Sequence, residues 1–235
     1  MSQNNFDIGA VDLNTGVVST FAGKKLAFAS GELVDLPKAP ATEAVLNCPG
    51  RMVFSSGVLY MANFAAGAPY KVTYDKTSEI WTAQYFGIKG ADTRSRVDAV
   101  GIDARFNMPS GMAIEGDGSV LVADTINKCI RRISPTGAVS TLPGVEVKKP
   151  IGIATSETTI YVSDANQYTS GIKAINVKSN VLVSIAGSAD QGFKDGFGTG
   201  ASFSTPSNIA LGGKFLFVVD FATTPGSLST SDSRV

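Results

Sequence analysis

The sequence predicts an all-β protein in which one four-stranded antiparallel unit recurs along the chain. Four segments begin at a proline and run through an apolar strand to an Asp or Asn: Pro49 to Asn63, Pro109 to Asp124, Pro150 to Asp164 and Pro206 to Asp220. The two ends of these segments are 14, 15, 14 and 14 positions apart. A spacing this constant indicates one supersecondary unit repeated in tandem.

The unit at 109–144 shows its strands most clearly. The clusters Gly116–Gly118 and Pro135–Gly137 mark tight turns. The apolar runs around them predict strands at 112–114, 120–124, 130–133 and 138–142. Units 49–87 and 150–187 contain the same four strand-length runs and also end on glycine. We therefore expect an antiparallel meander in every unit.

An apolar residue stands three positions before each proline, and we expect it to fill the gap between neighbouring sheets: Leu46, Phe106, Val147 and Phe203. Both ends of the repeat region carry half-units. Residues 8–23 match the second half of a unit, and residues 206–220 match the first half. Stacked four-stranded units of about 40 residues are typical of a β-propeller. We assign residues 1–222 to this domain and expect the Ser/Thr-rich tail, 223–235, to be disordered.

Two sequence runs carry a resemblance to a known family. Residues 122–133, VADTINKCIRRI, preceded by 104–113, ARFNMPSGMA, resemble the NHL repeat, and Gly192–Gly198 looks like the loop that precedes such repeats. The resemblance spans about residues 8–220. It implies an NHL-type β-propeller, a family that usually closes with six blades. Three complete units plus two half-units then form either a closed ring of four, in which the half-units pair, or an arc of a six-bladed propeller.

Composition argues against several function classes. The chain has 235 residues, 20 Lys plus Arg, 20 Asp plus Glu and no His. A balanced charge argues against a nucleic-acid partner, and the missing His removes the commonest acid–base residue and zinc ligand. The sequence contains neither a signal peptide nor a run of about 18 apolar residues. We expect a soluble protein of unspecified compartment, which is either complete or part of a longer polypeptide.

The two cysteines, Cys48 and Cys129, occupy different places in the repeat. A disulfide between them is an open alternative, and the pattern favours two separate thiols.

The Asp or Asn that ends each second strand is a candidate site residue: Asn63, Asp124, Asp164 and Asp220. A ring of carboxylates could hold calcium, but a residue type that recurs in every unit favours capping of backbone N–H groups in the turn that follows. Asp98 and Asp195 both lie 11 positions before a unit's proline, and their repetition also favours loop capping over chemistry.

The basic residues are densest around the second unit: Lys128, Arg131, Arg132, Lys148 and Lys149. The family resemblance implies a possible RNA contact there. Strand alternation sends Arg131 and Arg132 to opposite sheet faces, and no aromatic residue is interleaved for base stacking. The pattern therefore favours a solvated outer strand.

Aromatic residues crowd the first unit, and most fall at strand positions that predict packing between sheets: Tyr60, Phe64, Tyr70, Tyr74, Trp81, Tyr85 and Phe86. Phe64 and Tyr70 flank a loop between the second and third strands. Loops of this kind and the connections between blades lie on one face of a propeller. Together with Asp98, Asn127, Lys128 and Asp195, these two aromatic residues are the candidate binding residues of that face.

The sequence contains no phosphate loop, nucleophile elbow or metal-spaced cysteine pair. We therefore expect a non-enzymatic scaffold without a cofactor, which recognises an unidentified protein through loops on one face. Two alternatives stay open: a calcium-dependent lyase or hydrolase with Asp124, Asp164 and Asp220 as ligands, and an RNA-binding NHL module.

Overall fold

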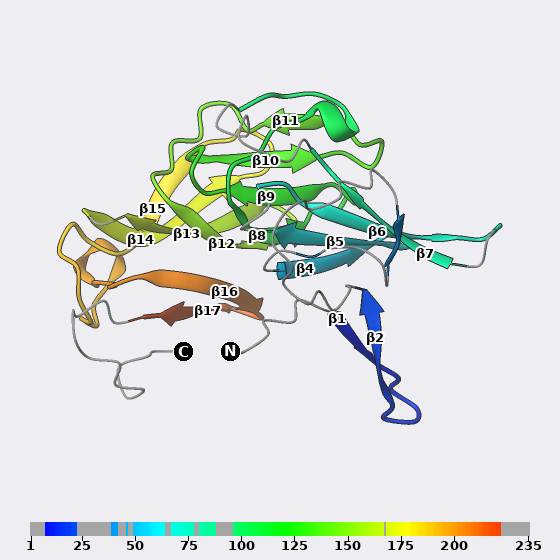
Figure 1. The fold of residues 1–235 in the computed structure, drawn as a ribbon. Helices are drawn as coiled ribbons and strands as arrows, with labels where there is room; N and C mark the ends of the chain where they lie inside the picture. Colours follow the sequence, from blue (N-terminus) through cyan, green and yellow to red (C-terminus); the bar gives the residue numbers. More distant parts are fainter. Residues whose placement is uncertain are drawn as a thin grey trace, which may run out of the picture.

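The computed structural model describes residues 8–22, 39–41, 46, 49–63, 67–77, 80–87, 96–166 and 168–221. Within these ranges the chain forms antiparallel sheets, and the short 3-10 helices η2 (Gly101–Asp103) and η3 (Gly198–Gly200) lie in the connections between them. Figure 1 shows the sheets following one another along an arc. Cys48, Phe64 and the tail at 223–235 lie outside the described residues.

Three successive meanders form the body of the arc. Blade 1 contains β4 (Pro49–Ser55), β5 (Val58–Asn63), β6 (Tyr70–Asp75) and β7 (Ile80–Tyr85). Blade 2 contains β8 (Pro109–Ile114), β9 (Val120–Asp124), β10 (Cys129–Ile133) and β11 (Val139–Thr141). Blade 3 contains β12 (Pro150–Thr155), β13 (Thr159–Asn166), β14 (Thr169–Asn176) and β15 (Leu182–Ala186). The predicted all-β architecture of four-stranded antiparallel meanders is thus confirmed.

Blade 1 carries an additional strand that the repeat did not predict. The two-residue strand β3 (Ala39–Pro40) pairs with β7 and makes this sheet five-stranded. It comes from the connection that precedes the unit, so the repeat pattern contains no signal for it.

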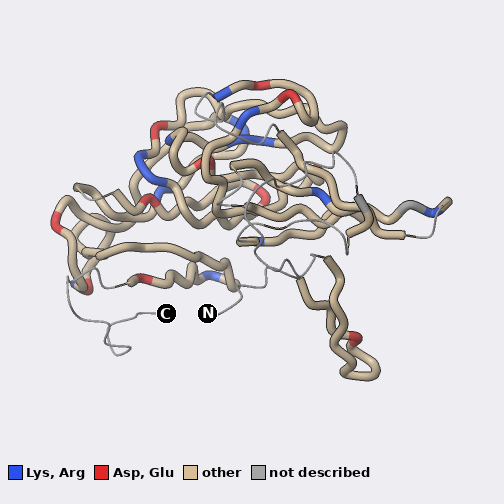
Figure 2. The backbone as a smooth tube through the Cα atoms, viewed as in Figure 1, with Lys and Arg blue, Asp and Glu red and all other residues tan. Residues whose placement is uncertain are grey.

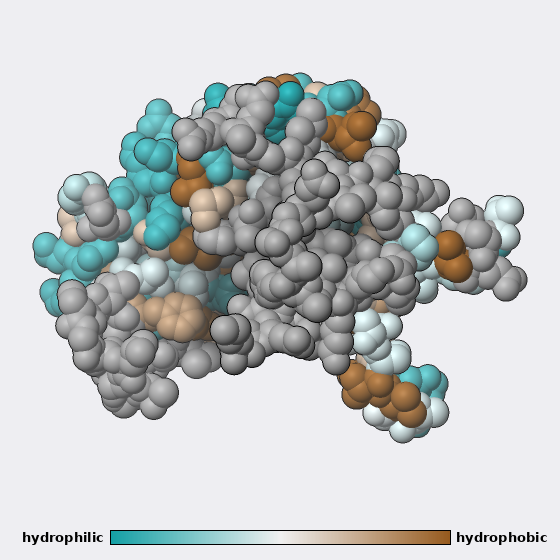
Figure 3. Space-filling model, viewed as in Figure 1, coloured by the Kyte–Doolittle hydropathy of each residue, from teal (hydrophilic) through white to brown (hydrophobic). Residues whose placement is uncertain are grey.

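The half-units form two separate hairpins at the ends of the arc (Figure 1). The N-terminal hairpin contains β1 (Ile8–Val11) and β2 (Val18–Ala22), and the C-terminal hairpin contains β16 (Pro206–Gly212) and β17 (Phe215–Asp220). Within the described residues these two hairpins do not pair with each other, so the four-bladed ring is not closed. Both hairpins expose apolar side chains, which in the N-terminal hairpin are Val11, Leu13, Val17 and Val18. Figure 3 shows hydrophobic surface on this hairpin.

The hydrophobic core lies between the sheets, one cluster to each gap. Phe106 is fully buried with residues of blades 1 and 2, and Val147 is buried with residues of blades 2 and 3. Leu46 packs between the N-terminal hairpin and blade 1, and the partly buried Phe203 packs between blade 3 and the C-terminal hairpin. The apolar residue three positions before each proline therefore fills the gap between sheets, as the pattern predicted.

The first strands of successive units, β4, β8, β12 and β16, contact one another along the inner edge of the arc. All four of these inner strands contain the same irregularity. The pairing register shifts between the opening proline and the third residue after it, in β4, β8, β12 and β16. The inner strands also approach one another closely. A Cβ atom added at Gly111 would lie 2.2 Å from the carbonyl oxygen of Ile151, and one added at Gly152 would lie 2.2 Å from that of Ser207. Only glycine permits this approach.

Candidate functional site

The aspartates that end the second strands cap backbone N–H groups. Asp164 accepts hydrogen bonds from the amides of Lys148 and Lys149, with distances of 3.0 and 2.6 Å. Asp220 and Asp124 accept equivalent bonds, and the donors are the amides of Ser204, Thr205 and Asn107. These amides precede the opening proline of the unit, whereas the sequence placed the donors in the turn after the aspartate. Each aspartate therefore joins the start of its unit to the end of the second strand.

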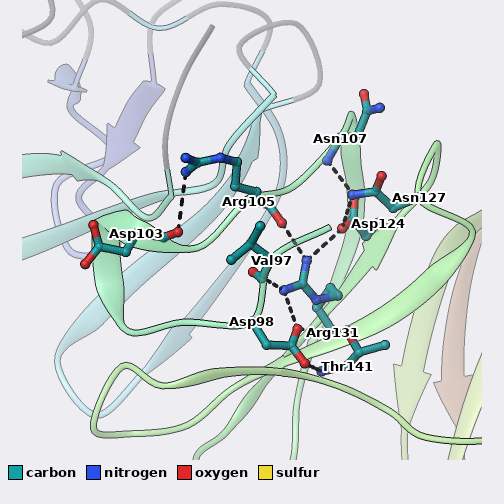
Figure 4. A network of polar contacts seen from close by, with 9 residues as sticks. All are labelled: Val97, Asp98, Asp103, Arg105, Asn107, Asp124, Asn127, Arg131 and Thr141. Carbon is teal, nitrogen blue, oxygen red and sulfur yellow. Dashed lines mark hydrogen bonds and ion pairs between the residues drawn. The ribbon is translucent and has the colours of Figure 1, made fainter. Parts of the chain in front are cut away.

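Blade 2 adds a buried arginine to this arrangement (Figure 4). Arg131 on β10 is fully buried, and its Nη1 donates to Asp124 Oδ2 at 3.1 Å. Its Nη2 donates to Asp98 Oδ1 at 2.7 Å. The carbonyl oxygens of Val97 and Arg105 accept two further bonds at 2.8 and 2.6 Å. The guanidinium group thus ties β10 to the connection that leads into β8.

The guanidinium group of Arg131 also lies over the ring of Phe106, 4.8 Å from the ring centre. This cation–π contact couples the ion pairs to the residue that fills the gap between blades 1 and 2. The network is therefore part of the blade-to-blade packing.

The two aspartates that pair with Arg131, Asp124 and Asp98, have pKa values shifted in opposite directions. Burial raises the pKa of Asp124 and outweighs the hydrogen bonds from Asn127, Asn107 and Arg131. Burial also acts to raise the pKa of Asp98, but the hydrogen bonds from Thr141 and the charge of Arg131 outweigh it and hold that pKa below its usual value. The Asp98 side chain is 48% exposed, whereas that of Asp124 is fully buried. Asp98 is therefore the solvent-facing end of the network.

The structure places most of the predicted site residues outside any common binding site. Asp98 pairs with Arg131, and Asn127 donates to Asp124 at 2.9 Å, so both support the fold. Tyr70 was expected beside a face loop, but it is buried and stacks on Tyr85 with ring centres 4.1 Å apart. The prediction for Tyr70 was wrong because cross-strand pairing with Tyr85 draws its ring into the core. Asp195 is exposed before β16.

The expectation of a solvated outer strand is wrong for the two arginines. Arg131 is fully buried, and Arg132 forms a two-point ion pair with Glu115, in which Nη2 and Oε1 are 2.8 Å apart. Figure 2 shows basic and acidic positions interspersed along the blades. In the described part of the chain, no group of three or more Cys, Asp or Glu side chains is placed to hold a metal ion.

The remaining basic residues of this group surround one cleft of about 570 Å³ between blades 2 and 3, which we call the lysine cleft. Its lining comes from the β9–β10 turn, the connection between the blades and the β13–β14 turn: Thr125, Ile126, Lys128, Lys148, Lys149, Asn166 and Tyr168. The three lysines are exposed. Tyr168 and Ile126 are also exposed, by 70% and 48%. The cleft therefore combines positive charge with an aromatic and an apolar side chain.

Local hydrogen bonds hold the walls of the lysine cleft. The Thr125 hydroxyl donates to the carbonyl oxygen of Pro150 at 2.8 Å and links the two blades. Lys128 has a φ of 54° and donates its amide to the carbonyl of Thr125, which closes the β9–β10 turn. Tyr168 is the functional candidate that sequence reasoning missed. Its signal was an aromatic residue in the connection between the second and third strands of its unit, the kind of loop expected on the binding face.

Comparison with known proteins shows the fold of this chain but assigns it to no family. No protein-family model and no curated protein matches the sequence. A chain of a nidogen/laminin complex matches with a TM-score of 0.55 and 13% identity, over 92% of this chain and 82% of that one. A streptogramin B lyase matches with a TM-score of 0.53 and 15% identity, over 90% of this chain and 54% of the other. An auxiliary nutrient binding protein from Bacteroides ovatus matches with a TM-score of 0.50 and 16% identity, over 70% and 42%.

This chain spans about half the length of the latter two structures. At these identities the likeness concerns the fold alone, and the fold is that of a β-propeller. None of the helices in the described ranges has the length and apolar character needed to cross a membrane.

Proposed function

We propose that this chain is a non-enzymatic, NHL-type propeller module that recognises a protein partner through loops on one face. The lysine cleft carries this proposal. Three loops from two neighbouring blades meet there, and they present Tyr168 and Ile126 beside Lys128, Lys148 and Lys149. An aromatic or aliphatic anchor within a polar rim is the usual composition of a protein-binding hot spot.

The hydrogen bonds beneath the cleft support this proposal. The side chain of Asp164 holds the backbone of Lys148 and Lys149, and Thr125 links the β9–β10 turn to Pro150. These loops are therefore fixed before a partner arrives, which lowers the entropy cost of binding. The titratable side chains that line the cleft are Lys and Tyr, without a carboxylate to pair with them as an acid–base couple.

The test is affinity capture with the purified chain, followed by reconstitution with the recovered protein. We expect Lys149→Glu combined with Tyr168→Ala to weaken binding of the reconstituted partner at least tenfold, because the variant removes the anchor and reverses a charge. The matched control, Lys178→Glu, alters an exposed lysine in the β14–β15 turn and should bind normally. A partner that binds both variants equally would contradict the proposal.

A lyase or hydrolase is the second candidate, favoured by the likeness of fold to streptogramin B lyase. Asp124, Asp164 and Asp220 already accept backbone N–H bonds, which leaves them poorly placed to share one ion. Metal found by elemental analysis, together with a rise in Tm on adding Ca²⁺, would support this candidate.

RNA is the third candidate, because the lysine cleft places Tyr168 beside three lysines. RNA binding that persists at physiological salt would support it, since purely electrostatic binding weakens steeply as salt rises.

A further inference from the structure

A second pocket lies at the inner edge of the arc, where the four inner strands begin. Its volume is about 370 Å³, and its lining comes from β4, β8, β12 and β16: Gly50, Arg51, Pro109, Ser110, Ile151 and Asn208. We call it the axial pocket. Each of the four inner strands therefore contributes residues next to its opening proline.

The residue two positions after the opening proline of each unit explains which side chains line the axial pocket. It is glycine in blades 2 and 3, where Gly111 and Gly152 allow neighbouring inner strands to approach. In blade 1 and in the C-terminal hairpin the same position holds Arg51 and Asn208. All four positions fall within the register shift of their strand, and such bulges re-aim side chains.

Arg51 and Asn208 meet although they are 157 positions apart in the sequence. Arg51 Nε donates to Asn208 Oδ1 at 2.8 Å. This bond joins β4, the inner strand of blade 1, to β16, the inner strand of the C-terminal hairpin. It also fixes the plane of the guanidinium group at the pocket wall.

The charge of Arg51 is not neutralised within the described part of the chain. No carboxylate there pairs with it, and neither its two Nη groups nor the Asn208 amide nitrogen has a hydrogen-bond acceptor among the described residues. Arg51 is half-buried, and burial lowers the pKa of its guanidinium group, which nevertheless stays protonated. A partly desolvated cation without a counter-charge is costly. The free polar groups at this wall are therefore donors that lack an anionic acceptor.

We propose that the axial pocket binds a small organic carboxylate. The Nη groups of Arg51 match the two oxygens of a carboxylate, and the Asn208 amide supplies a further donor. Pro109 and Ile151 form the apolar part of the lining and would face the hydrocarbon body of the ligand. One monocarboxylate neutralises one guanidinium, whereas a phosphate dianion would leave excess negative charge. The volume of about 370 Å³ suits a small molecule.

The experiment uses the full chain and ligand-observed NMR at constant ionic strength, with three probes. Benzoate carries a carboxylate on an apolar ring, benzamide is its neutral isostere, and inorganic phosphate is an anion without an apolar body. We expect saturation transfer to benzoate and little to benzamide. Arg51→Ala should weaken benzoate binding at least tenfold, whereas the charge-matched control Lys178→Ala should leave it unchanged.

Asn208→Asp provides a second variant whose expected effects have opposite signs. Its carboxylate would neutralise Arg51 from within, so we expect a Tm equal to or above that of the original chain together with loss of benzoate binding. This variant keeps the proposal testable if Arg51→Ala fails to fold. The proposal is overturned if benzoate does not bind, if benzamide binds as well, if phosphate binds more tightly, or if Asn208→Asp still binds benzoate.

Discussion

Replacing Arg131 by methionine should cost a large part of the stability of this fold. The substitution keeps an unbranched apolar chain and removes the guanidinium group that pairs with Asp124 and Asp98. The Asp124 side chain has no exposed surface, so its charge would be left buried without its cation. Removing one partner of a buried ion pair typically costs about 3–5 kcal/mol. The bond to the half-exposed Asp98 adds about 0–1 kcal/mol.

We therefore expect the free energy of unfolding to fall by about 3–6 kcal/mol, out of about 5–15 kcal/mol for an ordinary domain. Urea denaturation followed by circular dichroism measures this loss, provided that the m-value stays constant. Lys178→Met, at an exposed turn, is the matched control and should change stability by less than about 0.5 kcal/mol.

A double variant tests the cause of this loss. Adding Asp124→Asn to Arg131→Met removes the stranded charge, so it should recover more than about 1 kcal/mol relative to the single variant. The reasoning is refuted if Arg131→Met costs less than about 1 kcal/mol, or if the two substitutions are simply additive.

Three further predictions concern packing, pH and the buried thiol. Gly111→Ala should destabilise the fold by about 1–3 kcal/mol or more, because its Cβ would lie 2.2 Å from the Ile151 carbonyl oxygen. Thermal melts measure this loss. The control Gly116→Ala, which has open space around its Cβ, should melt almost as the original chain does. Burial acts to raise the pKa of Asp98, but the hydrogen bonds from Thr141 and the charge of Arg131 outweigh it and lower that pKa in the folded state. The ionised form of Asp98 therefore stabilises the fold at every pH above the unfolded-state pKa of about 3.9. This contribution disappears as the pH falls through the lower folded-state pKa. Urea denaturation from pH 2.5 to 7 should therefore show a flatter acid limb for Asp98→Asn, and parallel profiles would count against this. Burial, and then the charge of Asp124, raise the pKa of Cys129 to about 11, so peptide mapping should find Cys129 unmodified by iodoacetamide at pH 8 in the native chain and modified in urea.

The strands and the repeat could be predicted from the sequence because their signals are local. Alternation, turn residues and spacing predicted a strand at 120–124, where β9 is found. The apolar residue before each proline was also predictable, since a feature that recurs in every unit must serve the contact that every unit makes. The aspartate caps were predicted as caps with the wrong donors, because the partner amides lie 15 to 17 positions upstream.

The candidate sites depend on contacts that no local signal contains. The sequence pattern favours a solvated strand for Arg131, but Asp98, 33 positions earlier in the chain, pairs with it across the connection into blade 2. Tyr168 joins the lysines only because blades 2 and 3 bring their loops together.

The amino-acid sequence by itself determined that this protein is a repeat of four-stranded antiparallel meanders. The tertiary structure alone decided that the half-units stay apart, and that Arg51 meets Asn208 at the inner edge. The physical reason is that secondary structure follows from hydrogen bonds and side-chain alternation over a few residues. The placement of one blade against another depends on close packing, down to the absence of a Cβ atom at Gly111 and Gly152.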